Sequence, residues 1–362
     1  MTTTDEEETA LRSVSEGDVR RRVLTDCLQA SARLYMFFAR ETLAQAGEAG
    51  EPAVRESVRR YGQWRGTEMR QAHTALGMPI NVETLIRHWD SASTYVAKDE
   101  VADQGSYGPH DVSFDVTYCP AALAWKEDEF HRWGHVYCDE FHQSAATAYH
   151  PDAMVTIPIN MMKGDHRCAF RWVMANLADE DLEPRPEQEQ TELGRELAPL
   201  YAQTGDEADA MRLALTRTNR LLGGRYLTFV QALVEHLGED AASRIVSEAL
   251  TKWAADRGSR LQRRLERTGA EMTATTVSDE LDLAPAFTWQ VELDGSDEGA
   301  ILTAAVVATP LDEVWVHYAG ARWAELFWRR TMPALFGQLF PGHGVDVSTD
   351  SEGRLLALTV RR

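Results

Sequence analysis

The chain has 362 residues, of which 44% are hydrophobic and 26% charged, so it is long enough to bury a sizeable core. Its formal net charge of −20 argues against binding to nucleic acid or to an anionic membrane surface, and no apolar run is long enough to span a membrane. The acidic start does not resemble a secretory signal, and the four cysteines follow no dense spacing. Both features predict reduced thiols in the cytoplasm.

The first third of the chain is predicted to be mainly helical. Residues 1–19 are acidic and polar, and we expect them to form a disordered tail. Apolar spacing predicts a helix from Arg20 to Leu43 and a second one from Ala53 to about Leu76. A short helical piece is expected at Val82–Trp89, before a strand at Asp111–Tyr118 whose residues alternate in polarity.

The stretch that follows is dense in chemically reactive side chains and holds three of the four cysteines. A helix is predicted for Trp125–Tyr149, followed by strands at Met154–Met161 and Arg167–Val173 with a turn at residues 163–165. Four residues share one face of this helix because they recur at steps of four, three and four. They are His131, His135, Cys138 and His142.

The second half repeats this order of elements, with helices predicted at Met211–Leu237 and Asp240–Arg267 and strands from Phe287. Similar residues recur at an offset of 192 and, further on, of 190. The pairs are Arg33/Arg225, Phe37/Phe229, Glu56/Glu248, Tyr61/Trp253 and Gly66/Gly258, then Pro120/Pro310, Trp125/Trp315, Trp133/Trp323 and Pro151/Pro341. The sequence therefore predicts an α+β tandem duplication, in which each module has N-terminal helices followed by an antiparallel sheet covered by a helix.

The reactive residues are absent from the second copy. At an offset of 190, Thr309 stands for Cys119, Trp328 for Cys138 and Met332 for His142; near the end of the copy Cys168 falls on Leu356 or Ala357, depending on one gap. This contrast predicts a catalytic module at 20–177 and a degenerate structural module at 210–362. Residues 178–209, acidic and proline-bearing, are expected to be an exposed linker with room for one helical piece.

Two chemistries fit the candidate site. In the first, a cysteine thiolate attacks and an imidazole serves as base, with Cys119 or Cys138 as nucleophile and His142 as base. Asp165 would assist by orienting the imidazole or carrying a proton, although on its own it is better explained as a turn residue. Each cysteine taken alone also fits a small core residue.

In the second chemistry, soft sulfur and nitrogen ligands bind zinc. The candidate ligands are Cys119, Cys138, His142 and Cys168. Their spacings match no standard zinc motif, so we predict no cofactor and keep zinc as the alternative.

Several short motifs are recognisable in the first module. They are Cys119-Pro120, Trp125-Lys126, the mid-helix Cys138, Tyr149-His150-Pro151 and the run from Lys163-Gly164-Asp165 to Cys168-Ala169-Phe170. Over about residues 20–175 the chain therefore resembles the L-2-amino-thiazoline-4-carboxylic acid hydrolase family. The last motif is also similar to 4-vinyl reductase domains, which bind small molecules, so a non-catalytic sensor module is the rival prediction.

The resemblance implies hydrolytic opening of a C–N bond in a small heterocyclic or amidine-like substrate. It adds Cys168 to the catalytic candidates, and the candidate substrate-binding residues are Lys126, His135, Lys163 and Tyr149. A small molecule is the expected partner, without nucleic acid or membrane, and a homo-oligomer is left open.

Overall fold

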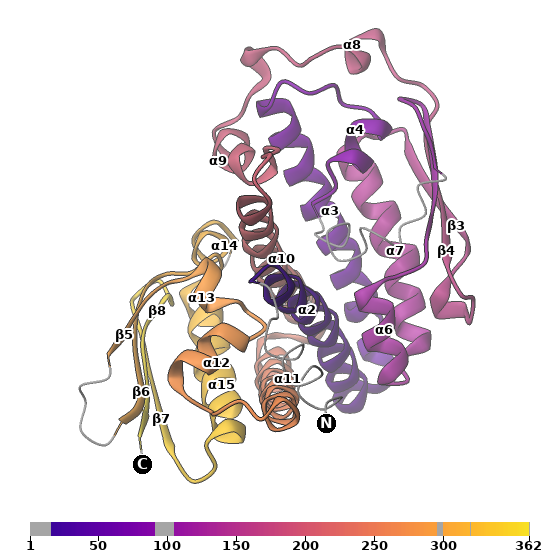
Figure 1. Cartoon of the computed structure of the whole chain (residues 1–362). Helices are drawn as coiled ribbons and strands as arrows, with labels where there is room; N and C mark the ends of the chain where they lie inside the picture. The colour runs from indigo at the N-terminus through magenta and orange to yellow at the C-terminus, as the bar shows by residue number, and fades with distance from the viewer. Residues whose placement is uncertain (1–15, 91–104, 295–299, 319, 362) are drawn as a thin grey trace, which may run out of the picture.

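The computed structural model describes residues 16–90, 105–294, 300–318 and 320–361, and within them two units have the same order of elements (Figure 1). The first 15 residues of the predicted tail lie outside the described residues, and α2 already begins at Glu16. The helices of the first unit are α2 (Glu16–Ala46), α3 (Glu51–Ala75), α4 (Val82–Arg87), α6 (Pro120–Glu127) and α7 (His131–Tyr149), with short 3-10 turns at Gly47–Gly50 and Met161–Lys163. Its strands are β1 (Ser106–Tyr107), β2 (Asp111–Val116), β3 (Ala153–Ile159) and β4 (Cys168–Met174).

The second unit has the same plan. Its helices are α10 (Glu207–Leu237), α11 (Glu239–Thr268), α12 (Ala274–Glu280), α13 (Pro285–Thr288), α14 (Asp312–Tyr318) and α15 (Ala321–Leu339). Its strands are β5 (Gln290–Asp294), β6 (Ala300–Ala308), β7 (Gly344–Thr349) and β8 (Leu355–Arg361). The two antiparallel sheets have the equivalent orders β1-β2-β4-β3 and β5-β6-β8-β7, which confirms the α+β class.

The sheets lie on opposite sides of the molecule and the helices fill the space between them (Figure 1). In each unit the long helix after the second strand, α7 or α15, covers the inner face of its sheet. The helices α2 and α10 lie side by side at the centre, α3 packs on α10, and α11 packs on α2. Each unit therefore buries part of its helical layer against the other unit.

The central helices α2 and α10 are related by a local two-fold axis, as the equivalent contacts of one tyrosine on each helix show. Tyr35 on α2 donates a hydrogen bond to the Trp133 carbonyl at 3.2 Å, and Tyr226 on α10 donates one to the Trp323 carbonyl at 2.8 Å. Tyr35 and Tyr226 are 191 residues apart, so the offset of 192 that the sequence suggested for the first helix is wrong by one position. The pairs Arg33/Arg225 and Phe37/Phe229 are therefore not structural equivalents.

The aromatic rings on the axis obey the same symmetry. The ring centroids of Tyr35 and Phe229 are 6.2 Å apart. Those of the symmetry-related pair, Tyr226 and Phe38, are 5.9 Å apart. Phe38 and Phe229, which the offset of 191 makes equivalent, contact each other at 5.1 Å. The two halves thus have one packing plan, as the predicted repeat requires; a duplication as its origin stays a prediction.

The predicted single helix Trp125–Tyr149 is wrong, because two helices occupy this stretch. Pro120 fits the first turn of α6, where its missing N–H is not needed, and α6 ends at Glu127. Glu129 then adopts a left-handed conformation with φ of 53°, which breaks the helix before α7 begins at His131. Periodicity alone does not reveal such a break, because both helices bury apolar side chains.

The acidic segment 178–209 is only partly exposed. It contains α8 (Asp179–Leu182), a 3-10 turn at Glu187–Glu189 and α9 (Glu192–Tyr201). Leu197 and Tyr201 on α9 are buried against α3 because the helix is strongly amphipathic. In the described ranges, no helix is both long and apolar enough to cross a bilayer.

Candidate functional site

A cavity of about 240 Å³ lies between the sheet and the helices of the first unit, and α10 of the second unit closes it. Its polar and reactive wall carries thiols, an imidazole and two guanidinium groups. These come from Cys119, Cys138, Cys168, His142, Arg65 and Arg225. The apolar wall is largely aromatic and includes Trp89, Phe114, Trp125, Phe141, Phe170 and Trp172. A partly open, mostly apolar hollow with a few convergent polar groups is typical of a small-molecule site.

Three different elements bring the sulfur atoms to this cavity. Cys119 is the N-cap of α6, and its Sγ accepts a hydrogen bond from the Ala122 N–H at 3.5 Å. Cys168 begins β4, opposite Val116 of β2 in the sheet register, and its Sγ accepts from the Met161 N–H at 3.3 Å. Cys138 lies in the middle of α7.

Burial keeps all three thiols protonated at neutral pH. It raises the pKa of Cys168 to about 11 and that of Cys138 well above its ordinary value. Burial also raises the pKa of Cys119, but the backbone amides at the start of α6 and the nearby Lys126 ammonium oppose this effect. At Cys168 the Met161 amide and Lys126 oppose burial in the same way, so Cys119, with two backbone amides and Lys126, has the larger set of local groups favouring its thiolate.

His142 presents an unprotonated nitrogen in the cavity. Its Nδ1 lies 2.7 Å from the Cys138 carbonyl oxygen, one turn earlier on α7, so Nδ1 carries the proton and donates it. The ring packs against the rings of Phe170, Trp172 and Trp89 at 5.0, 5.9 and 6.4 Å. Burial among these rings lowers the His142 pKa to about 4, so the imidazole is neutral and Nε2 is an acceptor.

Two buried arginines are the residues that sequence reasoning missed. Arg65 on α3 makes a two-point ion pair with Asp90, with Nε 2.7 Å from Oδ2. Arg225 on α10 donates from Nη1 to the Ser31 carbonyl and from Nη2 to the Tyr137 hydroxyl, both at 2.7 Å. One signal was available in the sequence: Arg225 is the one charged residue in the run Leu221–Val230. The structure buries every position of this run.

The structure brings four of the nine predicted site residues to the cavity and places five elsewhere. The four that line it are Cys119, Cys138, His142 and Cys168. Asp165 does not line it, because its Oδ2 accepts from the Asn160 N–H at 2.8 Å and so closes the β3–β4 connection. Lys163, in the same connection, is exposed.

The remaining candidates have local partners. The Lys126 ammonium lies 3.5 Å from the Asp165 carbonyl oxygen, outside the cavity lining. His135 pairs with Asp139 at 2.8 Å on α7, one helical turn away from the cavity-lining Cys138. The Tyr149 hydroxyl lies 3.0 Å from His73 Nδ1 in a separate core cluster. The one-face prediction for α7 thus holds for Cys138 and His142, whereas His131 is exposed.

The four zinc candidates share the cavity but do not form a ligand set. Across the described residues, no group of three or more His, Cys, Asp or Glu side chains is arranged to hold a metal ion. The hydrogen bond of His142 Nδ1 to its own helix also removes one of the two imidazole nitrogens from coordination. The mechanism that we propose therefore does not use zinc.

The corresponding region of the second unit is nearly filled. A hollow of about 40 Å³ lies between α15 and the sheet, and all its lining residues except Ser278 are apolar. Met332, the equivalent of His142, lines it, and Trp328, the equivalent of Cys138, is fully buried. In the second unit, packing residues thus occupy the positions equivalent to Cys138 and His142.

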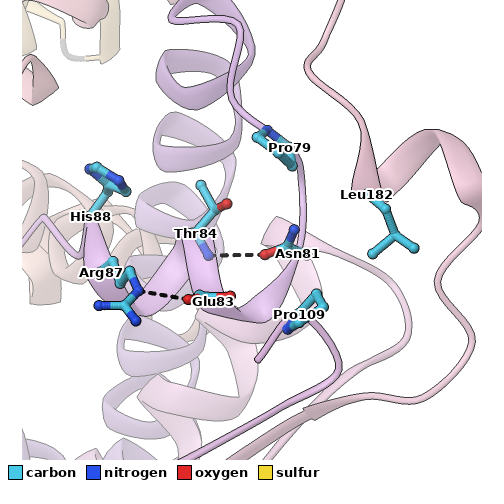
Figure 2. A pocket seen from close by; sticks show the side chains of 8 residues that line it. All are labelled: Pro79, Asn81, Glu83, Thr84, Arg87, His88, Pro109 and Leu182. Atoms are coloured by element: carbon cyan, nitrogen blue, oxygen red, sulfur yellow. Dashed lines mark hydrogen bonds and ion pairs between the residues drawn. The ribbon is translucent and has the colours of Figure 1, made fainter. Parts of the chain in front are cut away.

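A wider depression beside α4 has no such chemistry (Figure 2). It measures about 440 Å³, but three of its polar side chains, those of Asn81, Glu83 and Arg87, make hydrogen bonds at α4 itself. Asn81 Oδ1 accepts from the Thr84 N–H at 3.0 Å, and the Arg87 guanidinium donates to Glu83 at 2.8 Å (Figure 2). We therefore assign the functional site to the cavity of the first unit.

The cavity and the fold together define an α+β protein with a candidate small-molecule site in its first unit. Residues 28–172 match the model of the L-2-amino-thiazoline-4-carboxylic acid hydrolase family, so this part of the chain is similar to that family. The match contains the three cavity cysteines and His142 and ends before α10. The family name indicates hydrolase activity. No curated protein and no solved structure matches the chain.

Proposed function

We propose that the first unit hydrolyses a small heterocycle of the 2-amino-thiazoline type in this cavity. One observation carries the proposal. Cys119, Cys138, Cys168 and the neutral His142 line the same hollow, within the segment that matches the hydrolase family model. The flat aromatic rings of Phe170 and Trp172 fit a planar substrate, which would be held away from bulk water.

In this proposal Cys119 is the nucleophile and His142 the base. The helix amides and the Lys126 ammonium favour the Cys119 thiolate once a proton acceptor is present. His142 Nε2 is the acceptor that the cavity supplies, since Nδ1 is held by the Cys138 carbonyl. Asp165, predicted to assist, would act only by fixing the loop that carries Cys168.

The net reaction adds one water across a ring bond. The thiolate first bonds to the amidine carbon and the ring bond from that carbon breaks, with a proton passing to the released atom. Water then displaces the cysteine sulfur, which regains its proton. Breakage of the ring C–N bond, as the family resemblance implies, releases an amine, whereas breakage of the ring C–S bond releases a thiol. A thiol reagent distinguishes the two products.

The test is turnover of L-2-amino-thiazoline-4-carboxylic acid, followed by mass spectrometry. We expect Cys119→Ser and His142→Ala to lower kcat by about 100-fold or more. His131→Ala is the matched control, because His131 lies on the same helix but is exposed. Folded Cys119→Ser and His142→Ala proteins with full activity would overturn the proposal.

Ligand binding without chemistry is the second candidate, because burial raises the pKa of all three cavity thiols and so disfavours the reactive thiolate. Such a module would bind the intact heterocycle at equilibrium and release it unchanged. Calorimetric titration, with mass spectrometry of the recovered ligand, separates this outcome from hydrolysis.

A further inference from the structure

One buried arginine differs from the others in having no acidic partner among the described residues. Among the described residues, six arginines are buried. Five form ion pairs with carboxylates: Arg33 with Glu127 and Asp128, Arg65 with Asp90, Arg185 with Asp181 and Glu189, Arg220 with Glu68 and Glu313, and Arg257 with Asp282. The sixth is Arg225, for which the described part of the chain provides no carboxylate within ion-pair distance.

Arg225 is also the arginine that the second unit contributes to the cavity. Its side chain is 9% exposed and belongs to the cavity wall. The Ser31 carbonyl and the Tyr137 hydroxyl accept one hydrogen bond each, while the buried Nε–H has no partner. The guanidinium carbon lies 4.8 Å from the centre of the Tyr61 ring and 5.0 Å from that of Tyr137.

A buried guanidinium keeps its charge, so the missing counter-charge has a physical consequence. Burying a cation without an anion is unfavourable, and neutral acceptors such as Ser31 O and Tyr137 Oη compensate only part of it. Arg65, the other cavity arginine, is already neutralised by Asp90. Of the described residues that line the cavity, Arg225 is therefore the one that offers a ligand an unpaired positive charge.

We propose that Arg225 binds the carboxylate of the substrate, so that α10 of the second unit completes the site of the first. The guanidinium presents planar N–H donors that match a carboxylate, and the low-dielectric cavity strengthens the pairing. The class of ligand is thus a small planar monocarboxylate. The identity of the substrate rests on the proposed function, whereas the anion-binding role of Arg225 does not.

In this proposal Arg225 takes the substrate-binding role that the sequence analysis gave to two lysines. Lys126 and Lys163, predicted to bind substrate, do not line the cavity. The second unit, predicted to be purely structural, would then supply a binding residue.

The experiment compares two ligands that the enzyme cannot open. Thiazole-4-carboxylate carries the charge, and thiazole-4-carboxamide has nearly the same shape without it. Binding of each to the full chain is measured by calorimetric titration. We expect the wild type to prefer the carboxylate. We also expect Arg225→Gln to weaken carboxylate binding by roughly 10- to 100-fold and to leave carboxamide binding within about two-fold.

Two further variants serve as controls. Arg225→Lys keeps the charge without the planar fork, so it should recover part of the carboxylate affinity. Arg212→Gln changes an exposed arginine on the same helix and should change neither affinity. If Arg225→Gln does not fold, the wild-type and Arg225→Lys titrations still decide the matter.

The outcomes separate this inference from the proposed function. A wild type without preference for the carboxylate, or an Arg225→Gln protein that loses both ligands equally, would overturn the anion site. Carboxylate binding that depends on Arg225, together with no turnover of the thiazoline, would overturn the hydrolase proposal alone. Turnover of the thiazoline, together with carboxylate binding that does not depend on Arg225, would overturn the anion site and leave the hydrolase proposal standing.

Discussion

A Cβ atom on Gly66 of α3 would lie 2.2 Å from the backbone oxygen of Ala145 on α7. This approach brings α7, with Cys138 and His142, against α3, and it has an equivalent in the second unit. There a Cβ on Gly258 of α11 would lie 2.6 Å from the Leu335 oxygen. The close contact of the two helices in each unit therefore requires glycine at these positions.

Gly66→Ala should consequently lower the free energy of unfolding by about 1–3 kcal/mol, because the helices must move apart to admit the methyl group. Gly337→Ala is the matched control, since a Cβ there meets nothing within 4 Å. Its helical position should make that change stabilising by about 0.5–1 kcal/mol. Urea unfolding of both variants checks the prediction, and an unaffected Gly66→Ala protein would contradict the packing described.

A buried ion pair joins the two units. The Arg220 guanidinium on α10 donates to both Glu68 carboxylate oxygens on α3, at 2.9 Å for Oε1, and both side chains are almost fully buried. Glu68→Gln should cost about 3–5 kcal/mol, because it leaves a buried cation without its main partner. Glu235→Gln, which alters an exposed partner of Arg60, should cost less than about 1 kcal/mol in the same urea titration.

Stability should fall as the pH drops from about 6.5 towards 3. His73 is fully buried between Tyr149 and the His88 carbonyl, and burial lowers its pKa to about 3. Between these two pH values the unfolded chain binds a proton at this position and the folded chain does not, so protons favour unfolding. His73→Gln should make the loss of stability with acidification less steep, whereas His131→Gln, at an exposed position, should not.

Thiol labelling should report the electrostatics of the cavity. Maleimide modification should be slow at pH 7, because burial raises the pKa of each cavity thiol. It should accelerate as the pH approaches 11, the value near which Cys168 titrates, and Cys119 should react first because the α6 amides and Lys126 favour its thiolate. Peptide mass spectrometry identifies the labelled sites, with the fully buried Cys27 as the internal reference.

Local patterns were sufficient for some of the site. The spacing of Cys138 and His142 placed both on one helical face, and both line the cavity. The repeated order of helices and strands was also visible, because apolar periodicity is a local property of the chain. The break between α6 and α7 was missed because it rests on one left-handed residue, Glu129, which carries no glycine or proline signal.

Other parts of the site depend on long-range geometry. Cys168 reaches the cavity through the pairing of β4 with β2, and this register cannot be read from either strand alone. Arg225 reaches it because α10 packs across the axis onto the first unit. Lys163 and Tyr149 were chosen from motif positions, and folding placed one in solvent and the other in a different core cluster.

The contact of Phe38 with Phe229 across the axis has a consequence for assembly. In a polypeptide ending after β4, α2 and α3 would keep an apolar face that only another chain could cover, and the hollow would lack its α10 wall. Here the covalent connection formed by residues 175–206 holds the two halves at a fixed effective concentration. Dilution of the protein therefore cannot separate α10 from the first-unit cavity that it closes.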